Sequence, residues 1–485
     1  MDTNVVHFIG ICGAGMSAVA KLLRDSEWQV SGSDQGFYPP ISDFLTQEGL
    51  PCVTPHAPEN IPADTSLIVI GKHAKLTPEH NEEVRRAFEL QAQGKAHIAS
   101  YPDILNLLTQ KTENIVVTGS YGKSTTTTLI AWTLHHGATD PSYFIGAIPL
   151  DFQANAHKGS GRYFVLEGDE YPSANWDSSP KFLHYNASTV VLTSCEHDHF
   201  NEFPTEADYL APYQELVRRM SHKNLLVACA DGKLVDRAIS EAKCRVVTYS
   251  GGDHPTADWF VSEVYDSETP QRFLIQRREA GAITLSIPIT TKLLGEHNRQ
   301  NIVGCVATLL ESNALEIPQI QSALSAFRGI RRRLEFKSEE SSIYLYEDLS
   351  SSRPKAVAAL HALRQNRPTS RIYAIFQPHT FSFRSRQALE WYPGMFAEAD
   401  AVLVFSPPEL RGLASGEMLS HDEIIDSIRA GNPIPVHVVR NAEDILDTLL
   451  PVLKAGDVAA FMTSGGMEGA ISTTISRIVQ EFPRR

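Results

Sequence analysis

Three segments of the chain open with the same pattern of apolar and polar positions. A short apolar run comes first, and these runs lie at 5–9, 115–118 and 342–346. A turn of small and polar residues follows each run and leads into a stretch with helical spacing, at 17–23, 125–134 and 355–363. Strands that alternate with helices at this spacing predict parallel α/β sheets.

The remaining pattern divides the chain into domains. Further strands are expected at 29–33, 371–376, 401–405, 435–439 and 458–463, and a hairpin at 272–277 and 283–289. At about 150 residues per domain, 485 residues suggest three domains. We predict an α/β protein with a Rossmann-like N-terminal domain over 1–110 and a central P-loop ATPase-like domain with added antiparallel strands over 111–329. A Rossmann-like C-terminal domain is expected over 330–485.

Composition narrows the classes of partner. The chain has 43 Lys and Arg against 57 Asp and Glu, a net charge of −14, which argues against a nucleic-acid binder. Six cysteines without a C-x-x-C pair predict reduced thiols. The first residues lack the basic region and apolar core of a signal peptide, and no apolar run is long enough to span a membrane. We expect a cytoplasmic protein that binds neither nucleic acid nor membrane.

The strongest candidate site is the turn 119–124, which reads Gly-Ser-Tyr-Gly-Lys-Ser. A glycine-rich turn between a strand and a helix points backbone N–H groups at phosphate. Lys123, on an exposed loop, would reach the outer phosphates of a nucleotide, and the Ser124 hydroxyl would bind Mg²⁺. Two residues separate the glycines where the usual P-loop has four. The residues expected to bind phosphate are Gly119, Ser120, Gly122, Lys123, Ser124 and Thr125.

Acidic and imidazole side chains follow two later strands. Glu167 comes at the end of an apolar run at 163–166, and His199 comes shortly after another at 189–193. The carboxyl ends of parallel strands converge on one crevice, so both side chains are expected to meet Ser124 around a metal ion. A carboxylate and a hydroxyl suit Mg²⁺. The alternative for an isolated acidic cluster is a solvated turn.

A second glycine turn lies near the N-terminus. Gly10, Gly13 and Gly15 follow the first strand, and Asp34 ends the next one. The order is G-x-x-G-x-G, whereas the dinucleotide fingerprint is G-x-G-x-x-G. An NAD(P) dehydrogenase is therefore one alternative, with Asp34 on a ribose hydroxyl. Another phosphate-rich ligand fits the turn equally well.

The order of these motifs resembles that of the Mur ligases of peptidoglycan synthesis over essentially the whole chain. The short P-loop, the acidic strand end, Glu-x-Asp-His and Gly-x-His-Asn occur in the family's order. More specific matches are Gly32-Ser-Asp34 with 38–40, Phe144-Ile-Gly146 with Pro149, Glu170-Tyr171, 182–185, 295–298 with Asn301, 331–335 and 462–466.

The resemblance implies an ATP-dependent ligase with ATP and Mg²⁺ as cofactors, as a monomer or homodimer. It would activate the carboxylate of UDP-N-acetylmuramate as an acyl phosphate and join it to an amine. The implied catalytic residues are Lys123, Glu167, His199 and Arg333, and the implied metal ligands are Ser124, Glu167 and His199. ATP would also contact Asn298, Arg333 and Asp348. The UDP-sugar would contact Gly13, Gly15, Met16, Asp34 and Lys72, and the acceptor His379, Arg353 and Arg384.

The acceptor and the activity have alternatives within this resemblance. The chain is most similar to members that add the tripeptide L-Ala-γ-D-Glu-meso-diaminopimelate in peptidoglycan recycling. The stretch 376–379, Phe-Gln-Pro-His, resembles members that add L-alanine. The P-loop has Tyr121 where relatives usually have His, and 347–354 lacks the two histidines that relatives carry there. A non-catalytic nucleotide-binding homologue is therefore a further alternative.

Overall fold

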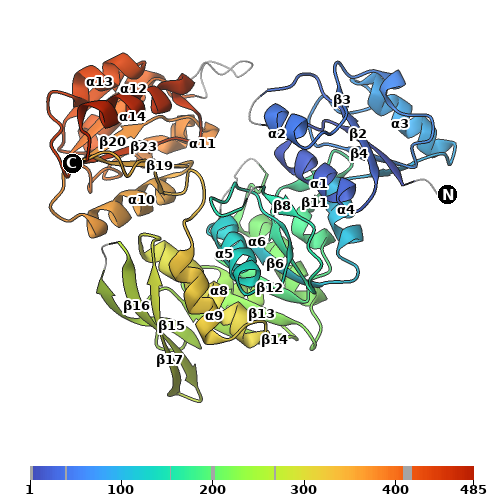
Figure 1. The fold of residues 1–485 in the computed structure, drawn as a ribbon, viewed down its shortest axis with the longest axis horizontal. Helices are drawn as coiled ribbons and strands as arrows, with labels where there is room; N and C mark the ends of the chain where they lie inside the picture. Colours follow the sequence, from blue (N-terminus) through green and yellow to red (C-terminus); the bar gives the residue numbers. More distant parts are fainter. Residues whose placement is uncertain are drawn as a thin grey trace. The chain divides into compact units, whose positions relative to one another are not determined.

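A computed structural model describes residues 4–38, 41–152, 154–197, 202–266, 269–407 and 418–484, except the side chain of Asp266. The chain forms two compact units (Figure 1). Unit 1 comprises Met1–Glu263, Phe273–Ile289 and Gln300–Phe327, and unit 2 comprises Val264–Arg272, Thr290–Arg299 and Arg328–Arg485.

Unit 1 begins with a five-stranded parallel sheet in the order β3-β2-β1-β4-β5. Its strands are β1 (Val5–Ile9), β2 (Gln29–Ser33), β3 (Cys52–Val53), β4 (Leu67–Ile70) and β5 (His97–Ala99). Its helices are α1 (Ala14–Arg24), α2 (Ile41–Gln47), η1 (Pro58–Asn60), α3 (Glu82–Ala92) and α4 (Tyr101–Leu108). Alternate strand residues point to opposite faces, so Val6 and Phe8 pack with α1 while Ile9 and Ile70 pack with α3.

A ten-stranded sheet follows in the order β17-β16-β15-β14-β13-β12-β6-β9-β7-β8. The strands near the site are β6 (Glu113–Thr118), β7 (Ser142–Phe144), β8 (Ala156–His157), β9 (Tyr163–Gly168), β12 (Thr189–Leu192), β13 (Leu225–Cys229) and β14 (Arg245–Ser250). β12, β13, β14, β6, β9 and β7 run parallel. The helices are α5 (Lys123–His136), η2 (Lys181–His184), α6 (Glu206–Arg219), α7 (Val235–Ile239), α8 (Glu296–Glu311) and α9 (Ile317–Ala326).

Antiparallel strands extend this sheet. β8 pairs antiparallel with β7 at one edge. At the other edge β15 (Trp259–Asp266) is followed by β16 (Gln271–Glu279) and β17 (Ala282–Thr291). Ala280 and Gly281 alone join β16 to β17, with φ of 48° and 82°, and so short a connection requires antiparallel neighbours. A separate hairpin pairs β10 (Pro172–Ala174) with β11 (Asp177–Pro180).

Unit 2 contains a six-stranded sheet in the order β18-β19-β23-β20-β21-β22. Its strands are β18 (Glu335–Phe336), β19 (Tyr344–Asp348), β20 (Ile372–Phe376), β21 (Ala401–Phe405), β22 (Val436–Val439) and β23 (Val458–Met462). Its helices are α10 (Arg353–Asn366), α11 (Phe381–Arg384), η3 (Arg386–Glu390), α12 (His421–Gly431), α13 (Ala442–Leu449), η4 (Met467–Gly469) and α14 (Ala470–Glu481). All described pairs are parallel except β18 with β19. One face packs with α10 and α12, and the other with α13 and α14.

These sheets confirm the predicted α/β class with added antiparallel strands. The strands expected at 5–9, 29–33 and 401–405 have the predicted bounds. The strand expected at 342–346 lies two residues later, because Tyr344 is the first residue to pair with β23. The domain boundaries near 110 and 329 stay a prediction. Within the described residues, no helix is long and apolar enough to cross a membrane.

Candidate active site

The P-loop forms the turn between β6 and α5, and it requires both of its glycines. Gly119 has a φ of +133° and Gly122 a φ of +81°, which L side chains rarely adopt. A Cβ on Gly119 would lie 2.5 Å from Thr193 Oγ1, and one on Gly122 would lie 2.4 Å from Asn301 Oδ1. The loop is therefore packed against Thr193, just after β12, and against Asn301 of α8.

Polar contacts with the segment after β12 hold the loop backbone. Tyr121 N–H donates to Ser194 Oγ at 2.8 Å, and Thr193 Oγ1 donates to the Tyr121 carbonyl at 2.5 Å. Ser120 Oγ donates to the Glu196 carbonyl and accepts from the Glu196 N–H, both at 2.7 Å. No side chain in the described part of the chain caps the first turn of α5. Its N–H groups are thus available to an anion, as phosphate binding at a helix N-terminus requires.

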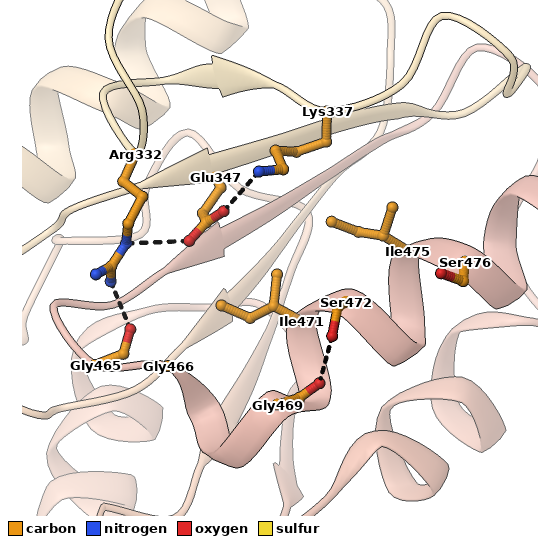
Figure 2. A pocket seen from close by; sticks show the side chains of 10 residues that line it. All are labelled: Arg332, Lys337, Glu347, Gly465, Gly466, Gly469, Ile471, Ser472, Ile475 and Ser476. Atoms are coloured by element: carbon orange, nitrogen blue, oxygen red, sulfur yellow. Dashed lines mark hydrogen bonds and ion pairs between the residues drawn. The ribbon is translucent and has the colours of Figure 1, made fainter. Parts of the chain in front are cut away.

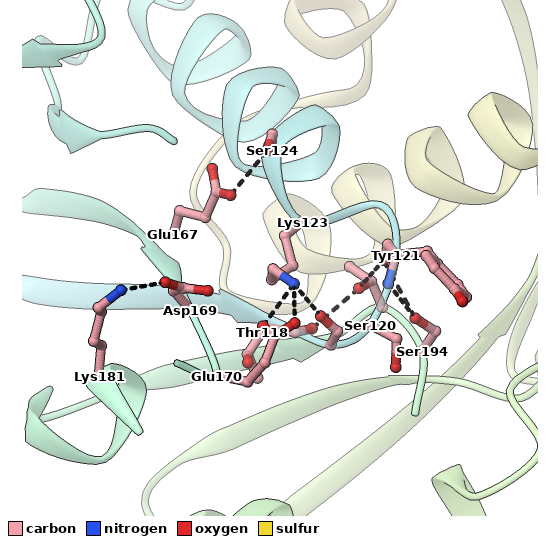
Figure 3. Close-up of polar contacts among 12 residues, drawn as sticks. Thr118, Ser120, Tyr121, Lys123, Ser124, Glu167, Asp169, Glu170, Lys181 and Ser194 are labelled. Atoms are coloured by element: carbon pink, nitrogen blue, oxygen red, sulfur yellow. Dashed lines mark hydrogen bonds and ion pairs between the residues drawn. The ribbon is translucent and has the colours of Figure 1, made fainter. Parts of the chain in front are cut away.

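The sequence predicted that Lys123 lies on an exposed loop. Lys123 is instead the first residue of α5. Its Nζ donates to the Gly119 carbonyl at 2.6 Å and lies 2.7 Å from Glu170 Oε2 (Figure 3). Burial alone would lower the pKa of Lys123. The carboxylates of Glu170, Asp169 and Glu167 outweigh burial and raise that pKa. Lys123 is therefore a charged ammonium held against the end of β9.

Glu167 and Ser124 meet, as the sequence predicted. Ser124 Oγ donates to Glu167 Oε1 at 2.8 Å, and Gly146 N–H donates to Glu167 Oε2 at 2.6 Å. Burial raises the pKa of Glu167, and these two bonds and the Lys123 charge offset burial only in part. A nearby cation would therefore stabilise the carboxylate.

The donor set suits a Mg²⁺ ion that keeps phosphate and water ligands, rather than a metal ion held only by protein side chains. Among the described residues, no three His, Cys, Asp or Glu side chains lie close enough together to hold a metal ion. Mg²⁺ is usually bound by one or two carboxylates, with phosphates and water completing its shell. Ser124 and Glu167 can supply such a partial set. His199, the third predicted ligand, lies outside the described residues.

The acidic cluster after β9 is divided among several partners. Asp169 pairs with Lys181, whose Nζ lies 5.5 Å from the centroid of the Tyr101 ring. Glu170 pairs with Lys123. Neither Glu170 nor Lys181 was predicted as a site residue, although two acids directly after a strand near the P-loop were a usable signal. Glu167 is thus the acid of this cluster that contacts the P-loop hydroxyl.

The N-terminal glycine turn is held by the Asp34 carboxylate. Gly10, with φ of +87°, is the glycine that the turn geometry requires. Asp34 Oδ2 accepts from Cys12 N–H at 2.8 Å and so fixes the turn. A Cβ on Gly15 would lie 3.2 Å from the Tyr101 ring, an approach tight enough that the ring would have to give slightly.

The other residues predicted for the sugar nucleotide lie around this turn. Gly13 is the N-cap residue of α1, and no described side chain caps the helix there. Met16 is buried in the core. Lys72 lies 4.0 Å from a Glu202 carboxylate oxygen, so it is partly neutralised at the surface of unit 1.

In unit 2, Asp348 organises the turn that carries Arg333. Its carboxylate accepts from Leu334 N–H at 2.9 Å and from Ser350 Oγ at 2.7 Å. Burial raises the pKa of Asp348, against these bonds and the charges of Arg333 and Lys355. Asn298 donates to the Leu294 carbonyl at 2.8 Å within the start of α8. The predicted contacts of Asn298, Arg333 and Asp348 with ATP stay predictions.

The predicted acceptor residues lie in unit 2, one in the turn after β20 and two on helices. Arg353 begins α10 and donates to the Trp391 carbonyl at 2.9 Å. Arg384 ends α11. His379 follows β20 and contacts Ser464 Oγ at 3.1 Å. Burial, together with the charges of Arg332 and Arg384, lowers the pKa of His379, so its imidazole is neutral at neutral pH.

A groove of about 400 Å³ lies between β19 and α14 in unit 2 (Figure 2). Arg332 donates to the Thr463 carbonyl at 2.8 Å, and its Nε lies 3.1 Å from Glu347. Lys337 lies 3.0 Å from the other oxygen of Glu347. A Cβ on Gly465 would lie 2.4 Å from the His379 ring, so the groove and His379 adjoin at this glycine. Arg332 was not predicted as a groove residue, because a run of basic residues is usually solvated.

Two family descriptions match the chain. Residues 5–95 match the description "Mur ligase family, catalytic domain", and residues 117–309 match "Mur ligase middle domain". The chain belongs to the Mur ligase family. It is therefore an ATP-dependent ligase of peptidoglycan synthesis that forms a C–N bond, as predicted, and the dehydrogenase alternative loses its support.

Individual Mur ligases resemble the chain along nearly its whole length. UDP-N-acetylmuramate–L-alanine ligase of Protochlamydia amoebophila is 29% identical over 97% of this chain and 97% of its own. The same named ligase from Thermotoga maritima has a TM-score of 0.75 at 22% identity, covering 97% of this chain and 98% of its own. A murein peptide ligase from Psychrobacter arcticus has a TM-score of 0.67 at 24% identity and covers 98% of both chains. The two structures show the shared three-part Mur ligase fold.

Proposed function

We propose that this Mur ligase activates the carboxylate of UDP-N-acetylmuramate with ATP and joins it to the amine of a peptide acceptor. The observation that carries the proposal is the contact of Ser124 with Glu167 beside Lys123, at the N-terminus of α5. A nucleoside triphosphate and its cation bind at a helix N-terminus that carries a hydroxyl, a carboxylate and an ammonium group.

The chemical problem is to make an amide from a carboxylate, which is a poor electrophile. Transfer of the γ-phosphoryl group from ATP to the carboxylate gives an acyl phosphate and ADP. The amine then attacks the acyl carbon, and the tetrahedral intermediate expels phosphate. Lys123 and Arg333 would stabilise the negative charge that gathers on the phosphoryl group. Bound Mg²⁺, held by Ser124 and Glu167, would supply further positive charge at the phosphates.

The turn after β1 is proposed to hold the sugar nucleotide. The N-terminus of α1 at Gly13 can bind the diphosphate through backbone N–H groups. Asp34 keeps the turn in shape through Cys12 N–H. Gly15 lies against the Tyr101 ring. Lys181 lies over the same ring and pairs with Asp169, which leads toward the P-loop. The reacting carboxylate would therefore extend from the α1 turn along Tyr101 toward Glu167.

For the acceptor we favour the tripeptide L-Ala-γ-D-Glu-meso-diaminopimelate. A groove of about 400 Å³ next to His379 gives room for more than one amino acid. Arg332, Lys337 and Arg384 provide cationic groups for an acceptor with several carboxylates, and the arginine fork suits a carboxylate best.

L-alanine is the second candidate, and two observations favour it. The Protochlamydia relative is named as an L-alanine ligase, and the stretch 376–379 resembles members that add L-alanine. In addition, Glu347 already pairs with both Arg332 and Lys337, which reduces the positive charge of the groove.

A competition experiment separates the two acceptors. The protein is incubated with ATP, Mg²⁺ and UDP-N-acetylmuramate, with tripeptide and L-alanine at equal concentration, and products are identified by mass. We expect a higher kcat/KM for the tripeptide. A higher value for L-alanine would replace the tripeptide assignment, and absence of phosphate release with either acceptor would contradict the proposed function.

A further inference from the structure

Two consecutive acids after β9 each hold a lysine, but in different surroundings. Asp169 pairs with Lys181, and 33% of the Asp169 side chain is exposed. Glu170 pairs with Lys123, and 1% of the Glu170 side chain is exposed. Breaking a buried ion pair is far more consequential than breaking an exposed one, because the remaining charge has no water around it. Glu170 therefore restrains Lys123 more strongly than Asp169 restrains Lys181.

The Lys123 ammonium is fixed from two directions. The Gly119 carbonyl accepts from it at 2.6 Å, and Glu170 Oε1 and Oε2 lie 2.9 Å and 2.7 Å away. Figure 3 shows the lysine turned toward Glu170 and the loop, and Glu167 with Ser124 on a separate side of the site. Glu170 thus differs from Glu167, because its partner is the phosphate-binding lysine itself.

We infer that Glu170 is a positioning residue that shares Lys123 with the phosphates of ATP. The inference rests on the proposed role of the P-loop in binding ATP. An ammonium already paired with a buried carboxylate attracts the ground-state phosphates less than an unpaired one. The attraction between the Lys123 ammonium and the transferred phosphoryl group is strongest when negative charge has gathered on that group in the transition state. Binding that is reserved for the transition state raises kcat, whereas binding given equally to the ground state does not.

The test is Glu170→Gln, which keeps the size of the side chain and removes its charge. Lys123 then interacts with ATP without the one carboxylate that contacts its ammonium directly. We expect Mg²⁺-ATP to bind at least fivefold more tightly by titration calorimetry, while kcat falls at least tenfold. Tighter binding combined with slower turnover distinguishes positioning from local damage, because damage to the loop weakens both.

Glu311→Gln is the matched control. Glu311 is also a glutamate of unit 1, and its side chain is 6% exposed. It pairs with Arg245 and Arg277 and accepts from Trp259 Nε1 at 2.9 Å. It lies outside the P-loop contacts. Its substitution is expected to lower the melting temperature and to leave ATP affinity within twofold of wild type.

The outcomes separate this inference from the proposed function. ATP affinity in Glu170→Gln that is unchanged or weaker, or a kcat within threefold of wild type, contradicts the inference. The calorimetric measurement needs no acceptor and no sugar nucleotide. If the wild-type protein binds ATP but forms no amide, the proposed function fails, and the ATP affinity of Glu170→Gln then decides on Glu170 alone.

Discussion

The turns after β1 and β6 share a design, yet they differ in charge. Each leads from a buried parallel strand into a helix whose first turn no described side chain caps. The α1 turn is held through Asp34 and a backbone N–H, and no lysine starts its helix. The α5 turn adds Lys123, Ser124 and two buried carboxylates. A helix N-terminus suffices to bind a diphosphate, whereas phosphoryl transfer also needs positive charge held where negative charge develops.

The largest expected effect comes from removing the charge that distinguishes the two turns. Lys123→Ala should lower turnover at least about 1,000-fold, since transition-state charge on the phosphoryl group loses its closest ammonium. Affinity for UDP-N-acetylmuramate should stay within threefold, because its proposed site is the other turn. Phosphate release and calorimetry measure the two quantities. Retained turnover would contradict the assignment of the P-loop as the ATP site.

Glu167→Gln should come next, with turnover about 100-fold lower and sugar-nucleotide affinity unchanged. The amide keeps the shape but lacks the charge that Mg²⁺ requires. Because the pKa of Glu167 is raised, its charged form is lost on acidification at a higher pH than for an ordinary glutamate. The apparent Mg²⁺ requirement should therefore rise as pH falls in the wild type and stay flat in the variant. A parallel loss of turnover and of sugar-nucleotide affinity would indicate structural damage instead.

Alanine at one glycine of each turn compares their backbones. Gly122→Ala should lower the free energy of unfolding by about 1–3 kcal/mol, because a non-glycine residue is strained at positive φ. Its Cβ also meets Asn301. Gly15→Ala has no such φ and should cost less than about 1 kcal/mol. Urea unfolding of both variants tests this, and equal losses would contradict the conclusion that the positive φ of Gly122 requires a glycine.

The smallest expected effect concerns Asp34. Asp34→Ala removes the acceptor of Cys12 N–H and should lower the free energy of unfolding by about 1 kcal/mol. The KM for UDP-N-acetylmuramate should rise about tenfold, with ATP affinity unchanged. Steady-state kinetics with each substrate varied in turn provides the measurement. A rise in the KM for ATP instead would reverse the assignment of the two turns.

The sequence was most informative where chemistry is local. Strand–turn–helix order, the P-loop glycines and the meeting of Glu167 with Ser124 follow from periodicity and from the convergence of parallel strand ends. The pairing of Lys123 with Glu170 did not follow, since the two lie 47 residues apart. β9 ends at Gly168, and beyond it strand alternation no longer predicts where a side chain points. Arg332 was missed for a similar reason, because the Thr463 carbonyl to which it donates lies 131 residues away.

The central claim is that the muramate carboxylate is activated by phosphoryl transfer. The most direct test uses UDP-N-acetylmuramate labelled with ¹⁸O in that carboxylate, incubated with the protein, ATP, Mg²⁺ and the acceptor. When an acyl phosphate forms and an amine displaces phosphate, one ¹⁸O atom passes to the phosphate. The account predicts phosphate with one ¹⁸O in proportion to the amide formed. Amide formation with unlabelled phosphate, or ATP hydrolysis without amide, would contradict it.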